Sequence, residues 1–242
     1  MKKLAGVSLM VVLCNMARGQ VIIALLFGDK LNTGKVEFGI IGGPALTNIS
    51  NIESDTRTGL NLGLYFNIRP DKRLFLHIEG TAKGAFGAKG IIPYSTGNDT
   101  LDHLFGSGSL ERKIKAFGLP VTARYAITPK FFVDGGVQSN MMLKSKDIFK
   151  AKVNGNTLEY TTEISDQVPL LDFGLLAGLH YKFSKDRRSM GIGIRYFQGL
   201  TDMLKPTPGT QTNVAWQLVI SIPVGTGKSS GANADAIQPP NK

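Results

Sequence analysis

The amino-acid sequence predicts an all-β protein: an eight-stranded, antiparallel, up-and-down transmembrane β-barrel behind an export signal. Residues 58–68 carry the clearest pattern, because apolar side chains alternate there with small or polar ones without interruption. Successive side chains of a strand point to opposite faces, so this segment has one apolar face and one polar face. Similar segments recur about eight times. Repeated strands of roughly 9–11 residues with one apolar face are typical of outer-membrane barrels.

The first 19 residues predict a cleaved signal peptide. Lys2 and Lys3 give it a basic start, residues 4–13 form an apolar core too short to span a bilayer, and Gly19 precedes the expected cleavage site. Cys14 is the only cysteine and lies inside this signal, so the mature chain forms no disulfide. We expect residues 20–225 to form the barrel and residues 226–242, rich in Gly, Ser, Asn and Pro, to form a disordered periplasmic tail.

The first four strands are expected at residues 36–47, 58–68, 74–84 and 114–127. Each has an apolar parity that we assign to the lipid face. In chain order these residues are Val36, Phe38 and Ile40; Leu60, Leu62, Leu64, Phe66 and Ile68; Leu74, Leu76, Ile78 and Ala82; Phe117, Leu119, Val121, Ala123 and Tyr125.

The last four strands are expected at residues 131–141, 168–183, 191–196 and 213–222. Their apolar parity consists of Phe131, Val133, Val137 and Met141; Leu171, Phe173, Leu175, Ala177, Leu179, Tyr181 and Phe183; Ile192, Ile194 and Tyr196; Val214, Trp216, Leu218, Ile220 and Ile222. A soluble β-sandwich would also alternate in this way. It would not be expected to place large aromatic residues so evenly on one parity of its strands, which favours the membrane barrel.

Charged residues identify the inner face of the expected barrel. A charge that faces lipid near the bilayer midplane costs about 2–4 kcal/mol, so the charged parity must be the interior. Eight strands leave an interior just wide enough for side chains. We therefore expect a buried, charge-balanced polar network formed by Glu37, Glu79, Lys83, Arg124, Asp134, Asp172, Lys182 and Arg195.

The connections between strands predict the orientation. Residues 69–73, 128–130 and 184–189 form short turns, whereas 48–57, 85–113, 143–167 and 201–212 are longer. Bacterial barrels keep short turns in the periplasm and long loops outside. Loops on a rigid scaffold are where binding usually occurs, so the outer loops 85–113 and 143–167 are the first candidate surface. The latter holds a basic-aromatic mixture suited to acidic glycans or a protein partner: Lys144, Lys146, Lys150, Lys152 and Tyr160.

The short turns are the second candidate surface, because they are basic. They carry Arg69, Lys72, Arg73, Lys130, Lys185, Arg187 and Arg188. The net charge is +10, and it falls to +7 once Lys2, Lys3 and Arg18 leave with the signal. An exported chain is not expected to meet nucleic acid, so we interpret these cations as groups near lipid head groups or acidic partners.

No motif predicts a catalytic, cofactor-binding or metal site. Residues 225–229 imitate the end of a phosphate-binding loop, but Ile222 stands where its first glycine is needed. We expect His77 and His180 to be hydrogen-bonded barrel residues. Some small barrels modify lipids, and the one conceivable nucleophile–base–carboxylate cluster consists of His103, Ser107, Ser109 and Glu111. We expect no enzymatic activity.

Several stretches resemble the PorT-like outer-membrane β-barrel proteins of Bacteroidota. These are L-L-F-G-D-K-L-N-T-G-K-V-E-F-G-I at residues 25–40, G-I-R-Y-F-Q-G-L-T-D-M at 193–203, and the proline-then-strand pattern of L-P-V at 119–121 and V-P-L at 168–170. The resemblance covers nearly the whole mature chain and rests on structural corners. It implies a small barrel of the OmpA/OmpX type in the outer membrane of a Gram-negative bacterium. The sequence departs from the usual pattern in the polar tail that follows its last strand.

The leading functional expectation is a structural or interaction role, in which outer loops or periplasmic turns contact envelope partners and the barrel surface contacts outer-membrane lipid. A narrow pore or a small-ligand-binding barrel is the alternative, and a lipid-modifying enzyme is a more distant one. No cofactor and no nucleic-acid partner are expected.

Overall fold

The structure is a computed structural model that describes residues 35–153, 155–186, 188–204 and 208–224. The expected signal peptide and the expected tail lie outside these residues. The nine described strands are β1 (Val36–Ile49), β2 (Arg57–Ile68), β3 (Leu74–Ile91), β4 (Ser109–Ala126), β5 (Phe131–Val153), β6 (Asn156–Glu163), β7 (Leu171–Lys182), β8 (Gly191–Gly199) and β9 (Asn213–Pro223). A short helix, α2 (Asp99–Phe105), lies between β3 and β4.

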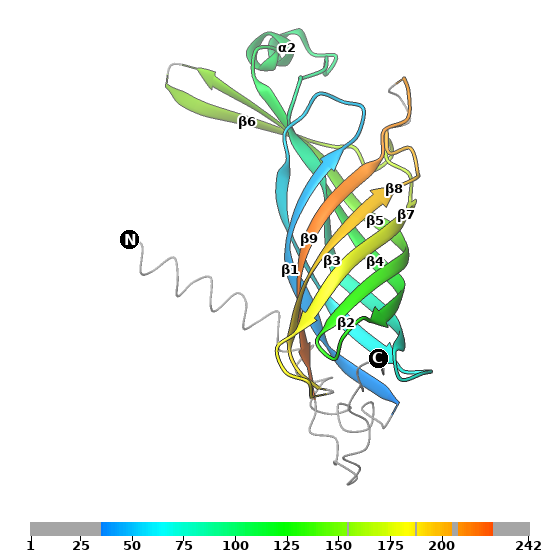
Figure 1. The fold of residues 1–242 in the computed structure, drawn as a ribbon. Coiled ribbons are helices and arrows are strands. Elements are labelled where there is room, and N and C mark those ends of the chain that lie inside the picture. The colour runs from blue at the N-terminus through cyan, green and yellow to red at the C-terminus, as the bar shows by residue number, and fades with distance from the viewer. Residues whose placement is uncertain (1–34, 154, 187, 205–207, 225–242) are drawn as a thin grey trace.

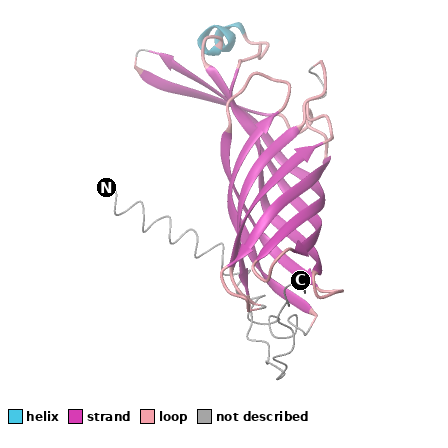
Figure 2. Ribbon diagram, in the orientation of Figure 1, coloured by secondary structure: helices cyan, strands magenta, loops and turns pink. Residues whose placement is uncertain are grey.

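Eight of the strands close into a ring. The hydrogen-bonded order is β4-β3-β2-β1-β9-β8-β7-β5, and an additional pairing of β4 with β5 joins the two ends. All the pairings are antiparallel. Strand β6 lies outside the ring because it pairs with β5 alone. The expected eight-stranded up-and-down barrel is confirmed, and Figures 1 and 2 show its tilted strands.

The outer surface of the barrel carries a belt of exposed apolar side chains. On β7, for example, Leu175 is 54% exposed, whereas its neighbour Leu176 is 2% exposed. Such a contiguous apolar surface is not stable against water and marks contact with lipid. The belt includes Leu74, Leu76, Phe117, Leu119, Tyr125, Val137, Met141, Phe173, Leu179, Ile194, Trp216, Leu218 and Ile220. Within the described residues, no helix is long and apolar enough to cross a membrane.

A β-bulge in β3 overturns one expectation about the interior. Before the irregularity, the odd-numbered Glu79 and Thr81 are buried; after it, the even-numbered Gly84 and Phe86 are buried. The extra residue switches the parity of the strand. Lys83 was expected inside, but it is exposed on the outer face.

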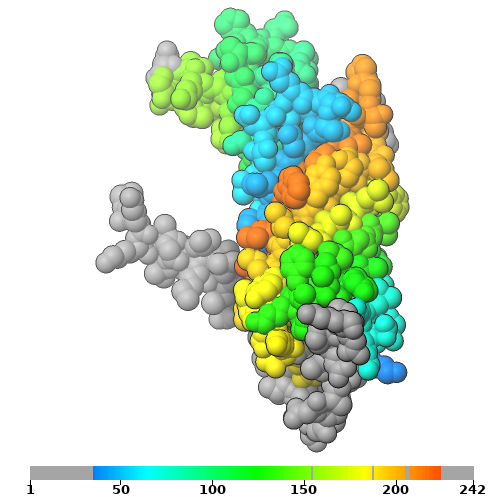
Figure 3. All heavy atoms as spheres, viewed as in Figure 1, coloured from blue at the N-terminus to red at the C-terminus, as the bar shows by residue number. Residues whose placement is uncertain are grey.

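The two longest expected loops contain long stretches of strand, and the first also contains helix α2. Residues 85–91 continue β3, β4 begins at Ser109, and β5 runs on to Val153 before β6 returns along it. These extensions form a projection at one end of the barrel, which we call the outer arm: residues 89–111, 148–153 and 155–163. Figures 1 and 3 show the outer arm rising beyond the barrel and leaning to one side. The expectation that these segments are loops was wrong. Polar residues at alternate positions made them look like loops, although the positions between them carry buried apolar residues.

A small apolar core of its own stabilises the outer arm. Phe105 of α2 packs with Leu110, Phe149 and Ala151 of the neighbouring strands, and all four are buried. Its ring lies 6.2 Å from that of Phe149, between centroids. Asn98 caps the start of helix α2, and its side chain accepts hydrogen bonds from the backbone N–H groups of the residues two and three positions later. The arm is therefore a built structure.

Candidate functional site

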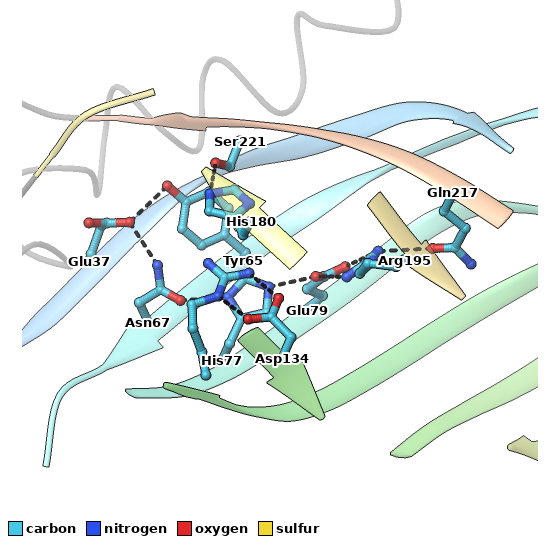
Figure 4. A network of polar contacts seen from close by, with 11 residues as sticks. Glu37, Tyr65, Asn67, His77, Glu79, Asp134, His180, Arg195, Gln217 and Ser221 are labelled. Atoms are coloured by element: carbon cyan, nitrogen blue, oxygen red, sulfur yellow. Dashed lines mark hydrogen bonds and ion pairs between the residues drawn. The ribbon is translucent and has the colours of Figure 1, made fainter. Parts of the chain in front are cut away.

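A chain of polar contacts crosses the barrel interior near the end that carries the short turns (Figure 4). Lys182 donates to Glu37 at 3.1 Å, and Asn67 donates to the same carboxylate at 2.8 Å. The His77 ring joins Asn67 to Glu79, with 2.5 Å on each side. These residues come from β7, β1, β2 and β3, so the chain of contacts connects strands across the lumen as well as along the sheet.

The same series of polar contacts continues to the opposite wall of the barrel. Arg195 of β8 makes a bidentate ion pair with Glu79, one arm of which measures 3.1 Å, and it also donates to Gln217 of β9 at 3.0 Å. Glu79 is 1% exposed and Arg195 is 5% exposed. A buried charge is tolerated when it is paired and hydrogen-bonded. The contacts therefore fix six of the eight barrel strands relative to one another.

Another buried ion pair lies on the β4–β5 wall. Arg124 and Asp134 are directly opposed in register, and the guanidinium donates to both carboxylate oxygens at 2.7 and 2.8 Å. This bidentate geometry is among the stronger charge-assisted contacts. This ion pair and the series of contacts from Lys182 to Gln217 together place three carboxylates, Glu37, Glu79 and Asp134, and three cations, Arg124, Lys182 and Arg195, inside the barrel.

The remaining two expected network residues lie elsewhere. Asp172 is fully buried, but it accepts hydrogen bonds from the side-chain amides of Asn213 at 3.0 Å and Asn140 at 3.5 Å. It stands at the start of β7, far along the barrel from Lys182 at the end of the same strand. Lys83 is outside, as described above. The structure thus brings six of the eight expected residues into one layer.

Glycines make the space that this layer fills. A Cβ atom on Gly193 would lie 2.9 Å from the His180 ring, and one on Gly191 would also collide with that ring. His180 itself contacts Ser221 at 3.3 Å. Both histidines that were expected to be hydrogen-bonded barrel residues are buried with such partners.

The other half of the lumen is closed by an apolar plug. Phe86 and Phe197 meet at its centre, with ring centroids 5.5 Å apart. Met203 reaches it from the β8–β9 connection, and Ile164 and Val168 reach it from the β6–β7 connection. The plug consists of Ile49, Phe86, Ala88, Ile114, Ala116, Met142, Ile164, Val168, Leu176, Phe197, Met203, Leu204 and Ala215. These side chains pack together across this half of the lumen.

Sequence reasoning missed this plug, although part of the signal was present. Leu176 shares its parity with Gly174 and Gly178, and Phe197 shares its parity with Arg195. The alternation that assigned the charged residues to the interior therefore also assigns Leu176 and Phe197 to it. Met203 and Ile164 follow no strand pattern, so only the folded connections place them over the lumen.

The base of the outer arm contains a further buried ion pair. Arg112 donates to both oxygens of Asp147 at 2.7 and 2.5 Å, and Tyr94 donates to the same carboxylate at 3.0 Å. Burial and the nearby Asp147 charge raise the pKa of Tyr94 to about 12, so its hydroxyl stays a donor. A pocket of about 170 Å³ opens beside it, between Tyr94, Phe105 and Phe149.

The conceivable catalytic cluster is not assembled. His103 is exposed on α2, and Ser107 and Ser109 are exposed beyond it. Glu111 instead accepts from Arg57 at 3.1 Å and from Lys150 at 3.2 Å. No hydrogen bond joins His103 to either serine in the described part of the chain. Over the same residues, no group of three or more His, Cys, Asp or Glu side chains is placed to hold a metal ion.

A closed ring of eight antiparallel strands with an apolar outer belt and a filled, charge-paired lumen defines a small membrane β-barrel. Residues 27–205 match the family model described as the outer membrane protein beta-barrel domain, and the chain belongs to this family. The protein is accordingly a small outer-membrane β-barrel protein.

The chain is also similar to solved barrels. One is Ail, the attachment invasion locus protein of Yersinia pestis, solved with the heparin analogue sucrose octasulfate: identity is 10%, coverage 77% of this chain and 97% of Ail, and the TM-score 0.42. Neisserial surface protein A has 12% identity, 76% and 96% coverage and a TM-score of 0.37. OprG from Pseudomonas aeruginosa has 12% identity, 78% and 94% coverage and a TM-score of 0.33. No curated protein matches the chain in sequence.

The closed ring predicts a measurable gel behaviour. Without boiling, the protein in detergent should migrate as a compact band, and boiling should shift it to the position of the unfolded chain, because a closed ring with no free edge resists unfolding by the detergent of a cold gel. Fractionation should recover it with outer membranes. Recovery from the soluble periplasm without detergent would contradict the membrane assignment.

Proposed function

We propose that this protein has a structural or interaction role in the outer membrane, and that the outer arm is its binding surface. The observation that carries the proposal is the separate apolar core of the arm around Phe105 and Phe149. A barrel needs no such core to stay closed. A projection with ordered strands, a helix and a buried Arg112–Asp147 pair at its base is suited to presenting a fixed surface to an envelope protein or an acidic glycan.

The orientation, the signal peptide, the family and the partners in this proposal rest on the sequence patterns described above. We assign the short turns to the periplasm and the arm to the exterior, as in other bacterial barrels, after removal of residues 1–19 as a signal peptide. We place the protein among the PorT-like barrels on the residues quoted above. Outer-membrane lipid and envelope proteins are the proposed partners, and we propose neither nucleic-acid binding nor enzymatic activity.

A pore is the second candidate, and the lumen argues against it. The polar layer and the apolar plug both block the passage, so a conducting state would require both to move. A binder of a small ligand in the lumen meets the same obstacle. The arm is therefore the better-supported surface.

Deletion of the arm tests this proposal. Ala88, Arg112, Asp147 and Thr162 lie on one line of paired residues, so residues 89–111 and 148–161 can each be replaced by Asn-Gly turns without changing the register. We expect the shortened protein to remain heat-modifiable, because the ring is intact. Proteins that co-purify with the full chain from native membranes in mild detergent should be lost.

A matched variant tests the other end. Neutralising Lys185 and Arg188 in a short turn, with glutamine at both positions, should leave the same partners bound. Partners that survive deletion of the arm and disappear in the turn variant would place the working surface in the periplasm and refute the proposal.

A further inference from the structure

Five lysines gather on the outer face of the β3–β4–β5 wall: Lys83, Lys113, Lys115, Lys144 and Lys146. We call them the rim lysines. Lys115 is directly opposite Lys144 in the sheet, and Lys113 is directly opposite Lys146. Side chains opposed in this way start about 4.5–5.5 Å apart, and like charges at that spacing destabilise a sheet. Two such pairs on neighbouring positions, with Lys83 exposed on the adjacent strand, form a concentrated positive surface.

The rim lysines stand where the apolar belt ends. In β4 every second residue from Tyr125 to Phe117 belongs to the belt, and Lys115 is the next position on that face. From Tyr125 to Lys115 the strand advances ten residues. At about 3.3 Å per residue and a tilt of about 40°, the rise is roughly 25 Å, the height of the apolar band of an outer-membrane barrel. On β5, Met141 and Leu143 end the belt just before Lys144.

The local carboxylates do not neutralise this surface. Lys113 pairs with Glu111 at 3.4 Å, but the Glu111 carboxylate also forms ion pairs with Arg57 and Lys150. Lys144 pairs with Glu163 at 3.5 Å, with both side chains largely in solvent. Lys83, Lys115 and Lys146 form no ion pair within the described residues. An excess of cations therefore remains at the edge of the bilayer.

We propose that the rim lysines bind the phosphate groups of a phosphorylated saccharolipid in the outer leaflet of the membrane. The site has the two parts such a lipid requires: cations at head-group level, and exposed apolar side chains such as Phe117 and Leu143 directly below them for its acyl chains. A phosphate between opposed lysines would also remove their mutual repulsion. The inference rests on the proposed orientation, in which this end of the barrel faces the outside.

Lipid binding by the full mature protein tests the inference. Native mass spectrometry in detergent would compare lipid A bearing both phosphates with the same lipid after removal of its phosphates. We expect the phosphorylated lipid to bind at least about tenfold more tightly. The triple variant K83Q/K115Q/K146Q should lose that preference, with a decrease in affinity of about a hundredfold, because each of the three basic residues near an anionic surface contributes about a fivefold factor.

A second triple variant, K72Q/K130Q/K185Q, is the matched control. It removes the same charge from the short turns at the opposite end and should bind as the unaltered protein does. Equal binding of the dephosphorylated lipid, or unchanged binding by K83Q/K115Q/K146Q, would overturn the inference. So would full displacement of the lipid by millimolar inorganic phosphate, which would indicate a site for a free anion.

An independent measurement separates this inference from the proposed function. The variant S107C places a thiol on the exposed outer arm, and a maleimide that cannot cross membranes should label it on intact cells. Labelling together with unchanged lipid binding by the rim variant overturns the lysine inference alone. Absence of labelling on intact cells, with labelling restored after lysis, overturns the orientation and both proposals with it.

Discussion

Replacing Arg195 with methionine is expected to destabilise the barrel by about 3–5 kcal/mol, because it leaves the buried Glu79 carboxylate without its cation. Glu79 is 1% exposed, and its remaining partner is the His77 ring at 2.5 Å. Gln217 would also lose the donor that reaches it from Arg195. The loss should appear in urea titrations of the folded protein in detergent, followed by the fluorescence of the single tryptophan, Trp216.

A double variant distinguishes a stranded charge from a simple loss of packing. Replacing Glu79 with leucine together with Arg195→Met removes both charges, so it should cost less than Arg195→Met alone. Lys83→Met serves as the control, because that side chain is exposed and its change should stay within about 0.5 kcal/mol. A cost below about 1 kcal/mol for Arg195→Met would show that the pair does not hold the strands together.

Replacing Phe197 with alanine in the apolar plug should cost about 3–5 kcal/mol. The ring is fully buried against Phe86, so its removal leaves a cavity that the closed ring of strands cannot collapse to fill. Phe173 on the lipid face provides the comparison, because it is 53% exposed and lipid can fill the space that Phe173→Ala leaves. The same urea titration measures both variants. Equal costs at the two positions would mean that the plug is not tightly packed.

The plug and the polar layer together predict that the unaltered protein carries no large stable conductance in planar bilayers. Phe197→Ala should also remain closed, since the contacts from Lys182 to Gln217 still cross the lumen. Porin-sized channels in the unaltered protein would refute the filled lumen and make the pore, now the second candidate, the leading function.

The sequence by itself determined the ring of strands and most of its inner face. Alternation is a local property: a side chain two residues away lies on the same face, so Glu37, Glu79, Arg124, Asp134, Lys182 and Arg195 could be assigned inward without knowing any partner. Which carboxylate meets which cation is not local. Lys182 reaches Glu37, 145 positions away in the chain, only because the ring closes.

Tertiary structure decided the points at which local alternation breaks or ends. One bulge in β3 turned Lys83 outward and made it part of the rim lysines, because an extra residue changes parity and leaves no clear mark in composition. The outer arm exists because distant segments, such as α2 and β6, pack Phe105 and Tyr160 against Phe149. The connections that carry Met203 and Ile164 fold over the lumen for the same reason: their apolar side chains are shielded from water only when the barrel is already closed.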